Sequence, residues 1–190
     1  MAKSYLIFLD GYTASGKSTG MGMLQKKLGN DFNYINKYTT RKPRIEEMEN
    51  FNFSESIFLD HQTFEKMHFH FVYKKEGEYY GFRKNEIEAM FGKEYVFIVA
   101  NQFFRQQICK RYGDLFIIKK IFIQATMEVR LERIRSANLG KEQTDFRLRK
   151  LRANKIRNLS EFDFVVENNS TLQSFYAILS EIISKIRYND

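Results

Sequence analysis

The sequence has little of the residue types and patterns that are typical of secreted, membrane or fibrous proteins. Among its 190 residues is a single cysteine, Cys109, which cannot form a disulfide within the chain, so a reducing compartment such as the cytoplasm is expected. No apolar run is long enough to span a membrane, and the N-terminal run from Tyr5 to Leu9 is too short for a signal segment. Internal repeats and low-complexity tracts are also missing, which excludes solenoids and disordered tails.

Length and composition favour one folded α/β domain over residues 1–190. Hydrophobic residues make up 43% of the chain and charged residues 28%, which is enough apolar material for a buried core. The formal net charge of +8 favours an anionic partner, such as a nucleotide or a nucleic acid. Charge alone does not separate these two partners.

Short apolar runs alternate with helical periodicity along the chain, which predicts a parallel sheet flanked by helices. The first run, Tyr5 to Leu9, precedes a helix predicted from Lys17 to Leu28. The further predicted strands are Tyr95 to Ala100, Lys120 to Ala125 and Phe162 to Val166. A final helix is predicted to bury Leu172, Phe175, Leu179, Ile182 and Ile186, with Ser170 and Gln173 forming a capping box at its start.

Two segments depart from this alternation. Residues 33–91 are rich in aromatic residues, contain the only proline, and are interpreted as a small mixed insert that binds the acceptor. Residues 127–156 are rich in arginine, and the stretch from Arg130 to Arg157 contains ten basic residues and three acidic ones. Taken alone, this excess is typical of a solvated helix pair.

A phosphate-binding loop is the strongest motif in the sequence. Residues 11–18 read G-Y-T-A-S-G-K-S and match G-x-x-x-x-G-K-S between a predicted strand and a predicted helix. Such a loop turns successive backbone N–H groups toward phosphate oxygens, and the helix N-terminus adds partial positive charge. The predicted ATP-binding residues of this region are Gly11, Thr13, Ala14, Ser15, Gly16, Lys17, Ser18 and Thr19. Lys17 is expected to reach the β- and γ-phosphates, and Ser18 to ligate the Mg²⁺ that accompanies ATP.

Further motifs, in the same order along the chain, resemble those of the guanylate kinase family. They are Tyr38-Thr39-Thr40-Arg41-Lys42-Pro43-Arg44, Phe51-Asn52-Phe53, Gly77-Glu78-Tyr79-Tyr80-Gly81 and, near the C-terminus, Phe162 to Asn168. The resemblance covers nearly the whole chain. It implies a P-loop NTPase fold and the reaction GMP + ATP to GDP + ADP.

The resemblance also implies roles for individual residues. Arg41, Arg44 and Tyr80 take the places of the family residues that hold the acceptor's phosphate, a role that suits the rigid donor fork of arginine. Residues 127–156 resemble the family's lid, so Arg130, Arg147 and either Arg133 or Arg135 are expected to close over the triphosphate. Asn168 is expected beside the adenine, and a surface asparagine is the alternative.

The sequence departs from the family where the base would be recognised. Phe71 stands where an acidic family side chain accepts hydrogen bonds from guanine, Asn101 stands near a second family carboxylate, and Val99 near an acidic position close to the metal. Lys37 and Phe51 replace a serine and a tyrosine, so that Lys37 either meets a more negative acceptor or points to solvent. Phe82 replaces a small hydroxyl residue, and it and its neighbouring phenylalanines either stack a base or form the insert's own core.

Together these patterns predict a kinase that transfers a phosphoryl group from Mg·ATP to a nucleoside monophosphate. GMP is expected to bind poorly, because a phenylalanine leaves the base's donors unpaired, at a cost of about 1–3 kcal/mol. The alternatives are a kinase for another phosphorylated metabolite or nucleotide, and a non-catalytic binding module of the same shape. Membrane and nucleic-acid partners are disfavoured, and the oligomeric state is left open.

Overall fold

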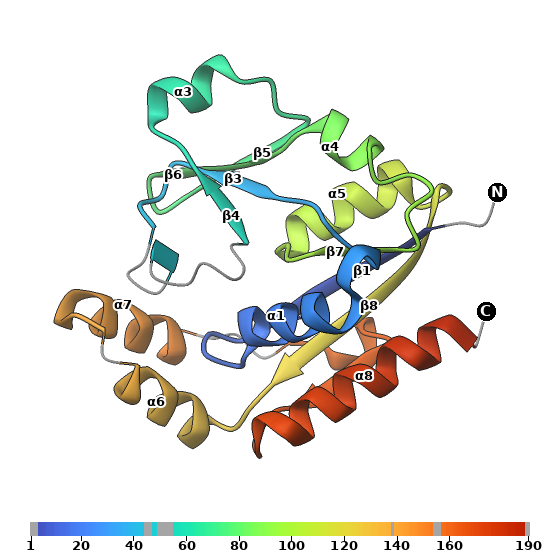
Figure 1. Ribbon diagram of the computed structural model, residues 1–190. Helices are drawn as coiled ribbons and strands as arrows, with labels where there is room; N and C mark the ends of the chain where they lie inside the picture. Colours follow the sequence, from blue (N-terminus) through green and yellow to red (C-terminus); the bar gives the residue numbers. More distant parts are fainter. Residues whose placement is uncertain (1–3, 44–46, 49–54, 138, 154–156, 189–190) are drawn as a thin grey trace. The chain divides into compact units, whose positions relative to one another are not determined.

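The computed structural model describes residues 4–43, 47–48, 55–137, 139–153 and 157–188 (Figure 1). The chain divides into two compact units. The first comprises Met1–Phe8 and Leu28–Ile118, and the second comprises Leu9–Lys27 and Lys119–Asp190. The expectation of one domain over residues 1–190 stays a prediction.

The core of the fold is a parallel five-stranded sheet flanked by helices, which confirms the predicted α/β class. Its strands follow the order β2-β7-β1-β8-β9. They are β1 (Ser4–Gly11), β2 (Phe32–Tyr34), β7 (Tyr95–Ile98), β8 (Phe116–Gln124) and β9 (Phe164–Glu167). Leu6 to Leu9 and all of β7 are buried, as expected for parallel strands covered on both faces.

The insert of the first unit contains a sheet of its own. Its four strands follow the order β4-β3-β6-β5, and three short helices stand around it or follow it. These elements are β3 (Lys37–Thr39), β4 (Ser56–Phe58), α3 (His61–Lys66), β5 (Phe71–Lys75), β6 (Glu78–Phe82), α4 (Lys84–Glu88) and α5 (Gln102–Tyr112). One boundary was wrong: Asn33 and Tyr34 lie in β2, which pairs with β7, so the first two residues of the predicted 33–91 insert belong to the core sheet.

A buried apolar cluster joins the insert's sheet to α5 within the first unit. Phe82 is fully buried there, and its ring meets that of Phe104 edge to face at 4.6 Å. Phe71, Tyr73 and Tyr80 pack against the same cluster. For Phe82, core packing is therefore the correct alternative.

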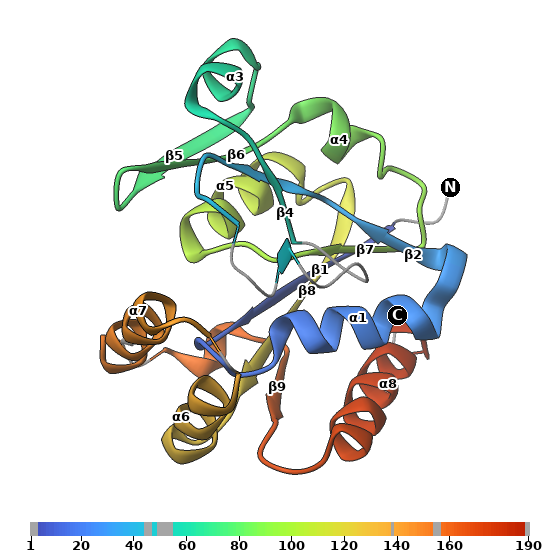
Figure 2. The same ribbon diagram turned by 60° about the vertical axis from the view of Figure 1, so that its left-hand side comes forward.

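The second unit carries the phosphate loop and the arginine-rich segment (Figure 2). Its helices are α1 (Lys17–Leu28, whose last residue falls in the first unit), α6 (Met127–Ser136), α7 (Lys141–Arg152) and α8 (Leu172–Tyr188), with 3₁₀ turns at Leu159–Glu161 here and Gly29–Asp31 in the first unit. Helices α6 and α7 contact each other and occupy the region predicted as the lid.

The last helix differs from its prediction in two details. Phe175, Leu179, Ile182 and Ile186 are buried, but Leu172 is 63% exposed because it lies in the first turn, beyond the core. The cap is Thr171 rather than Ser170, since its hydroxyl oxygen accepts a hydrogen bond from the Ser174 amide at 3.2 Å. Among the helices of the described ranges, none is long and apolar enough to cross a membrane.

Candidate functional site

The phosphate loop joins β1 to α1 and has the tightly curled backbone that the motif predicts. Gly11, Ala14 and Gly16 have φ values of +154°, +59° and +104°. An L side chain rarely adopts the conformations of the two glycines, and Ala14 holds a left-handed conformation that costs free energy. This cost falls in the segment that is predicted to bind phosphate.

Both glycines are also required by close approaches within the second unit. A Cβ atom on Gly11 would lie 2.2 Å from the carbonyl oxygen of Ile123 on β8. A Cβ atom on Gly16 would lie 2.4 Å from Nδ2 of Asn168, at the end of β9. The loop therefore lies against the ends of two strands, and a larger residue would displace the Ile123 backbone or the Asn168 side chain.

Two side chains fix the orientation of the loop's peptide groups. Asn168, which is 3% exposed, donates from Nδ2 to the carbonyl oxygen of Ser15 at 2.9 Å. Arg133 donates to the carbonyl oxygen of Asn168 at 2.9 Å and to those of Ala14 and Ser15 at 3.4 Å. Because C=O and N–H point in opposite directions across a planar trans peptide, the Gly16 N–H points away from these anchors. This is the orientation that phosphate binding needs.

Lys17 folds back over the loop. Its Nζ donates to the carbonyl oxygens of Gly11 at 2.9 Å and Tyr12 at 2.8 Å. The ammonium group is therefore already located beside the curled backbone. Ser18 and Thr19 follow in the first turn of α1, and both are exposed.

Mg²⁺ is the cofactor that such a loop implies. The ion prefers oxygen ligands, keeps several waters and is held by few protein groups together with phosphate oxygens. Ser18, an exposed residue in the first turn of α1 directly after Lys17, offers a hydroxyl oxygen of the kind that this ion accepts.

Among the arginines predicted for the lid, two contact the loop. Arg130 on α6 lies with its guanidinium 4.7 Å from the ring centre of Tyr12. Burial lowers the pKa of Arg130 and of Arg133, but arginine remains protonated at neutral pH. Arg133 contacts the loop carbonyls whereas Arg135 is exposed, and Arg147 is half-buried on α7.

In the insert, the predicted phosphate-binding Arg41 has an acidic partner. Its Nη1 and Nη2 atoms each donate to a carboxylate oxygen of Glu47 at 2.9 Å, and its guanidinium lies 5.1 Å from the ring centre of Phe58. This two-pronged geometry is the one arginine also uses for phosphate. The structure therefore shows Arg41 holding an oxyanion, here a carboxylate of its own chain.

Three other predicted acceptor residues are placed by the first unit. Tyr80 lies opposite Thr39 in the β3–β6 pairing, and its ring stacks on Tyr73 at 4.8 Å. Lys37 is half-buried two residues before Thr39 on β3. Asn101 caps α5, where its Oδ1 accepts a hydrogen bond from the Phe104 amide at 2.9 Å. Arg44 and Phe51 lie outside the described residues.

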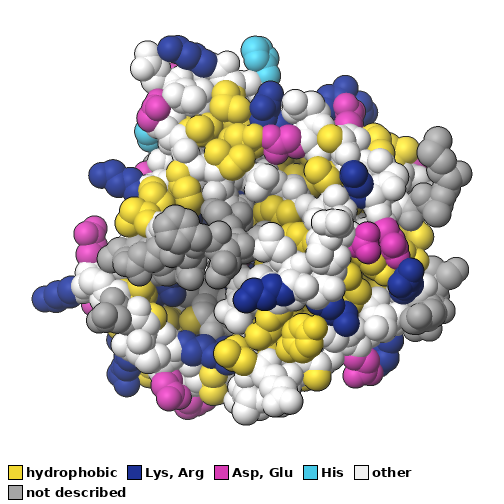
Figure 3. Space-filling view, in the orientation of Figure 1, with side chains coloured by type: hydrophobic (Ala, Val, Ile, Leu, Met, Phe, Trp, Pro, Cys, Tyr) yellow, Lys and Arg dark blue, Asp and Glu magenta, His cyan; other side chains and the backbone are white. Residues whose placement is uncertain are grey.

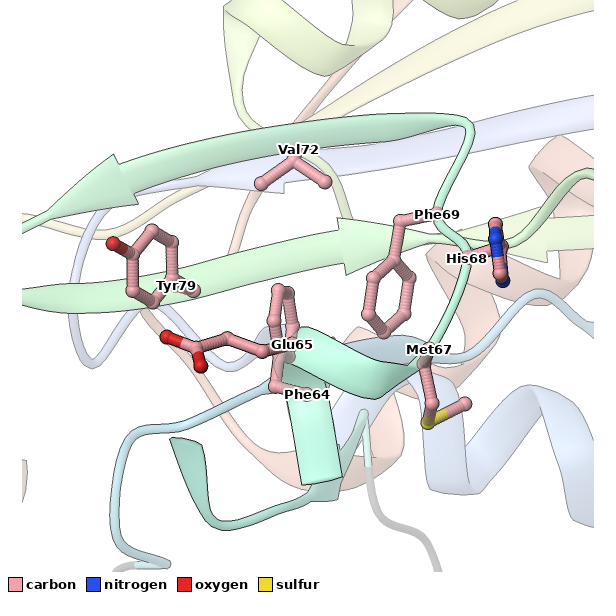
Figure 4. Close-up of a pocket in the computed structure, with 7 residues that line it drawn as sticks. All are labelled: Phe64, Glu65, Met67, His68, Phe69, Val72 and Tyr79. Atoms are coloured by element: carbon pink, nitrogen blue, oxygen red, sulfur yellow. The ribbon is translucent and has the colours of Figure 1, made fainter. Parts of the chain in front are cut away.

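The insert also contains an open hollow of about 410 Å³, on the face of its sheet to which Tyr79 contributes (Figure 4). Phe64, Phe69, Val72 and Tyr79 line it together with Glu65 and His68. Figure 3 shows apolar side chains gathered over α3 and the segment after it. Tyr79 and Tyr80 are successive strand residues and face opposite sides of the sheet, so this hollow contains none of the predicted acceptor residues.

Sequence reasoning missed two contributors, Tyr12 and Glu47. Tyr12 lies inside the loop motif, at a position where the motif accepts any residue, and only its aromatic character could have drawn attention to it. Glu47 lies six residues after Arg41, and nothing in that spacing indicates an ion pair.

Comparisons with known proteins point to one family. The family model for guanylate kinase matches residues 3–186. The chain is 27% identical over 184 residues to a guanylate kinase of Rickettsia conorii, covering 94% of this chain and 79% of that protein. It is 26% identical over 187 residues to a guanylate kinase of Rickettsia prowazekii, covering 96% and 92%.

A solved structure shares the fold. The crystal structure of guanylate kinase from Anaplasma phagocytophilum superposes with a TM-score of 0.60 at 16% identity, covering 99% of this chain and 88% of that one. The match of the family model to nearly the whole chain supports a nucleotide kinase function. The chain belongs to the guanylate kinase family.

Proposed function

We propose that the protein transfers the γ-phosphoryl group of Mg·ATP to a nucleoside monophosphate. The observation that carries this proposal is the phosphate loop, with Lys17 Nζ held 2.8–2.9 Å from two loop carbonyls and the loop's peptides fixed by Asn168 and Arg133. Such a loop suits a triphosphate, because backbone N–H groups and one mobile ammonium group share its charge.

In this mechanism the protein positions charge and supplies no nucleophile. When ATP binds, Lys17 exchanges its two carbonyl partners for phosphate oxygens. Arg130 and Arg147 from α6 and α7 balance charge that develops on the transferred group. Mg²⁺, held by Ser18 and the phosphates, supplies further positive charge when bound. Asn168 contributes to ATP binding indirectly: its side-chain amide holds the Ser15 carbonyl oxygen and so orients the Gly16 N–H toward the phosphates.

On the acceptor side, Arg41 exchanges Glu47 for the acceptor's phosphate. The exchange replaces one two-pronged oxyanion by another, so the guanidinium needs little rearrangement. Tyr80 adds a neutral donor, and Lys37 and Asn101 complete the proposed acceptor set with Arg44 and Phe51. Lys37 and Tyr80 are half-buried on paired strands, which limits the motion of their side chains.

We further propose that GMP is a poor acceptor. Phe71 offers no oxygen to the guanine donors, and the Asn101 oxygen already accepts the Phe104 amide. A base with unpaired donors loses about 1–3 kcal/mol, or roughly fivefold to 150-fold in affinity. A monophosphate of another base, or another phosphorylated metabolite, should therefore be used better.

A panel of monophosphates tests this function. Each acceptor is incubated with Mg·ATP, and ADP release is followed by a coupled assay, with Lys17→Ala as the matched inactive control. We expect release that depends on an acceptor, is abolished in the control and is weaker with GMP than with the best acceptor. ATP binding without transfer to any acceptor would instead support a non-catalytic binding module.

A further inference from the structure

Tyr12 is contacted from three directions within the second unit. On one side its ring lies 4.7 Å from the Arg130 guanidinium, and on another it meets Phe122 of β8 edge to face at 5.2 Å. Its hydroxyl oxygen accepts a hydrogen bond from the Arg157 amide at 3.3 Å. Phe122 precedes the arginine-rich segment 127–156, Arg130 lies within it, and Arg157 follows it. Together the three contacts restrict the position of the Tyr12 ring.

The same residue also contacts Lys17 through its backbone. The Tyr12 carbonyl oxygen accepts hydrogen bonds from Lys17 Nζ at 2.8 Å and from the Ser15 amide at 3.3 Å. Its side chain and its main chain therefore meet two different cations, one on α6 and one on α1.

The contact with Arg130 has a physical basis. A guanidinium over an aromatic face is attracted by the ring's quadrupole, more strongly where water is excluded, and Arg130 is only 6% exposed. The contact with the ring restricts the rotamers that the Arg130 side chain can adopt. A prepositioned cation loses less conformational entropy when it meets an anion than a freely rotating one.

We propose that Tyr12 is a positioning residue that holds Arg130 beside the phosphate loop in the orientation used during phosphoryl transfer. Tyr12 acts through Arg130 and does not itself touch the transferred group. The functional part of this inference rests on the proposed kinase reaction, whereas the stack itself does not. An aromatic residue at the second position of the loop is thus a determinant of rate.

Kinetics of a short variant series test the role. Tyr12→Leu should lower kcat about five- to thirtyfold, the loss expected for one partly buried cation–π contact. Tyr12→Phe keeps the ring and should restore kcat to within about twofold, since only the Arg157 contact is lost. Tyr176→Leu, an exposed tyrosine on α8 of the same unit, is the matched control and should leave kcat unchanged.

A double-mutant cycle separates positioning from general stability. In an Arg130→Ala background, Tyr12→Leu should change kcat by less than about twofold, because the residue it positions is gone. If Tyr12→Leu is equally harmful in both backgrounds, the proposal is overturned.

A measurement independent of activity keeps the two proposals distinguishable. In the folded wild-type protein the Nε–H signal of Arg130, assigned by its loss in Arg130→Lys, should show a ring-current shift in ¹H–¹⁵N NMR. The shift should persist in Tyr12→Phe. An unshifted signal in the wild type overturns the stack without involving the reaction. Absence of any phosphoryl transfer together with a shifted signal would refute the kinase function while leaving the stack intact.

Discussion

The predicted donor loop and the predicted acceptor insert differ in the groups that they offer to an oxyanion. In the loop, the backbone conformation is decisive: three residues have positive φ angles, and hydrogen bonds from Asn168 and Arg133 orient the peptide groups. In the insert, the contact is between two side chains. Arg41, a predicted acceptor residue, holds the carboxylate of Glu47 through two hydrogen bonds. In the proposed reaction, phosphate binding by the loop would therefore depend mainly on the main chain, whereas binding of the acceptor would depend on side chains such as Arg41.

This difference sets the size of the expected effects. Substitutions in the loop should reduce turnover with every acceptor alike, because they act on ATP. Substitutions in the insert should change the apparent affinity for the acceptor and leave that for ATP intact.

Lys17→Ala should have the largest effect. It removes the one mobile ammonium group from the loop, and loss of a comparable transition-state donor lowers kcat by about 10²–10³-fold. Initial rates at saturating ATP and acceptor measure it, with circular dichroism confirming the fold. Retained turnover would contradict the role given to the loop.

Arg41→Ala should come next. A hydrogen-bonded charge pair contributes about 1.5–3 kcal/mol, so the KM for the acceptor should rise about 10–100-fold while the KM for ATP stays within about twofold. Arg41→Lys should recover only part of the loss, because an ammonium group cannot form the two-pronged contact. Equal increases in both KM values would argue that Arg41 supports the fold instead.

Asn168→Ala should have an intermediate effect on the donor side. The Ser15 carbonyl loses a buried partner, which costs about 1–3 kcal/mol of stability and loosens the loop. Chemical denaturation measures the stability loss, and calorimetry should show ATP binding weakened about tenfold. Unchanged ATP affinity despite lower stability would show that the loop keeps its orientation without Asn168.

Glu47→Gln should have the smallest effect and the opposite sign. A neutral amide competes less well than a carboxylate for Arg41, so the KM for the acceptor should fall about two- to fivefold, at a stability cost of about 1 kcal/mol or less. A rise in KM would indicate that Glu47 holds Arg41 in its working position rather than competing with the acceptor.

The sequence predicted those elements whose conformation depends on residues close by in the chain. The run from Tyr5 to Leu9 lies in a largely buried strand, residues 11–18 form the curled loop, and the predicted helix from Lys17 to Leu28 is α1. Each depends on neighbours within a few residues, which is the range over which periodicity and turn chemistry act.

Features that depend on distant partners were not predictable. The pairing of Asn33 and Tyr34 with β7 is decided by a strand about 60 residues away, and a three-residue strand has too short a pattern to show it. The Tyr12–Arg130 stack and the Asn168–Ser15 hydrogen bond join residues more than 100 positions apart. Ser170 and Thr171 are both good caps, so the sequence could not choose between them.

The most direct test of the account is to follow where the γ-phosphoryl group goes. ³¹P NMR of a reaction containing Mg·ATP and the best acceptor of the panel distinguishes transfer from hydrolysis. We predict that the phosphoryl group appears on the acceptor's phosphate, with ADP in equal amount and little inorganic phosphate. Release as inorganic phosphate alone, or consumption of ATP that is independent of the acceptor, would contradict the assignment as a nucleotide kinase.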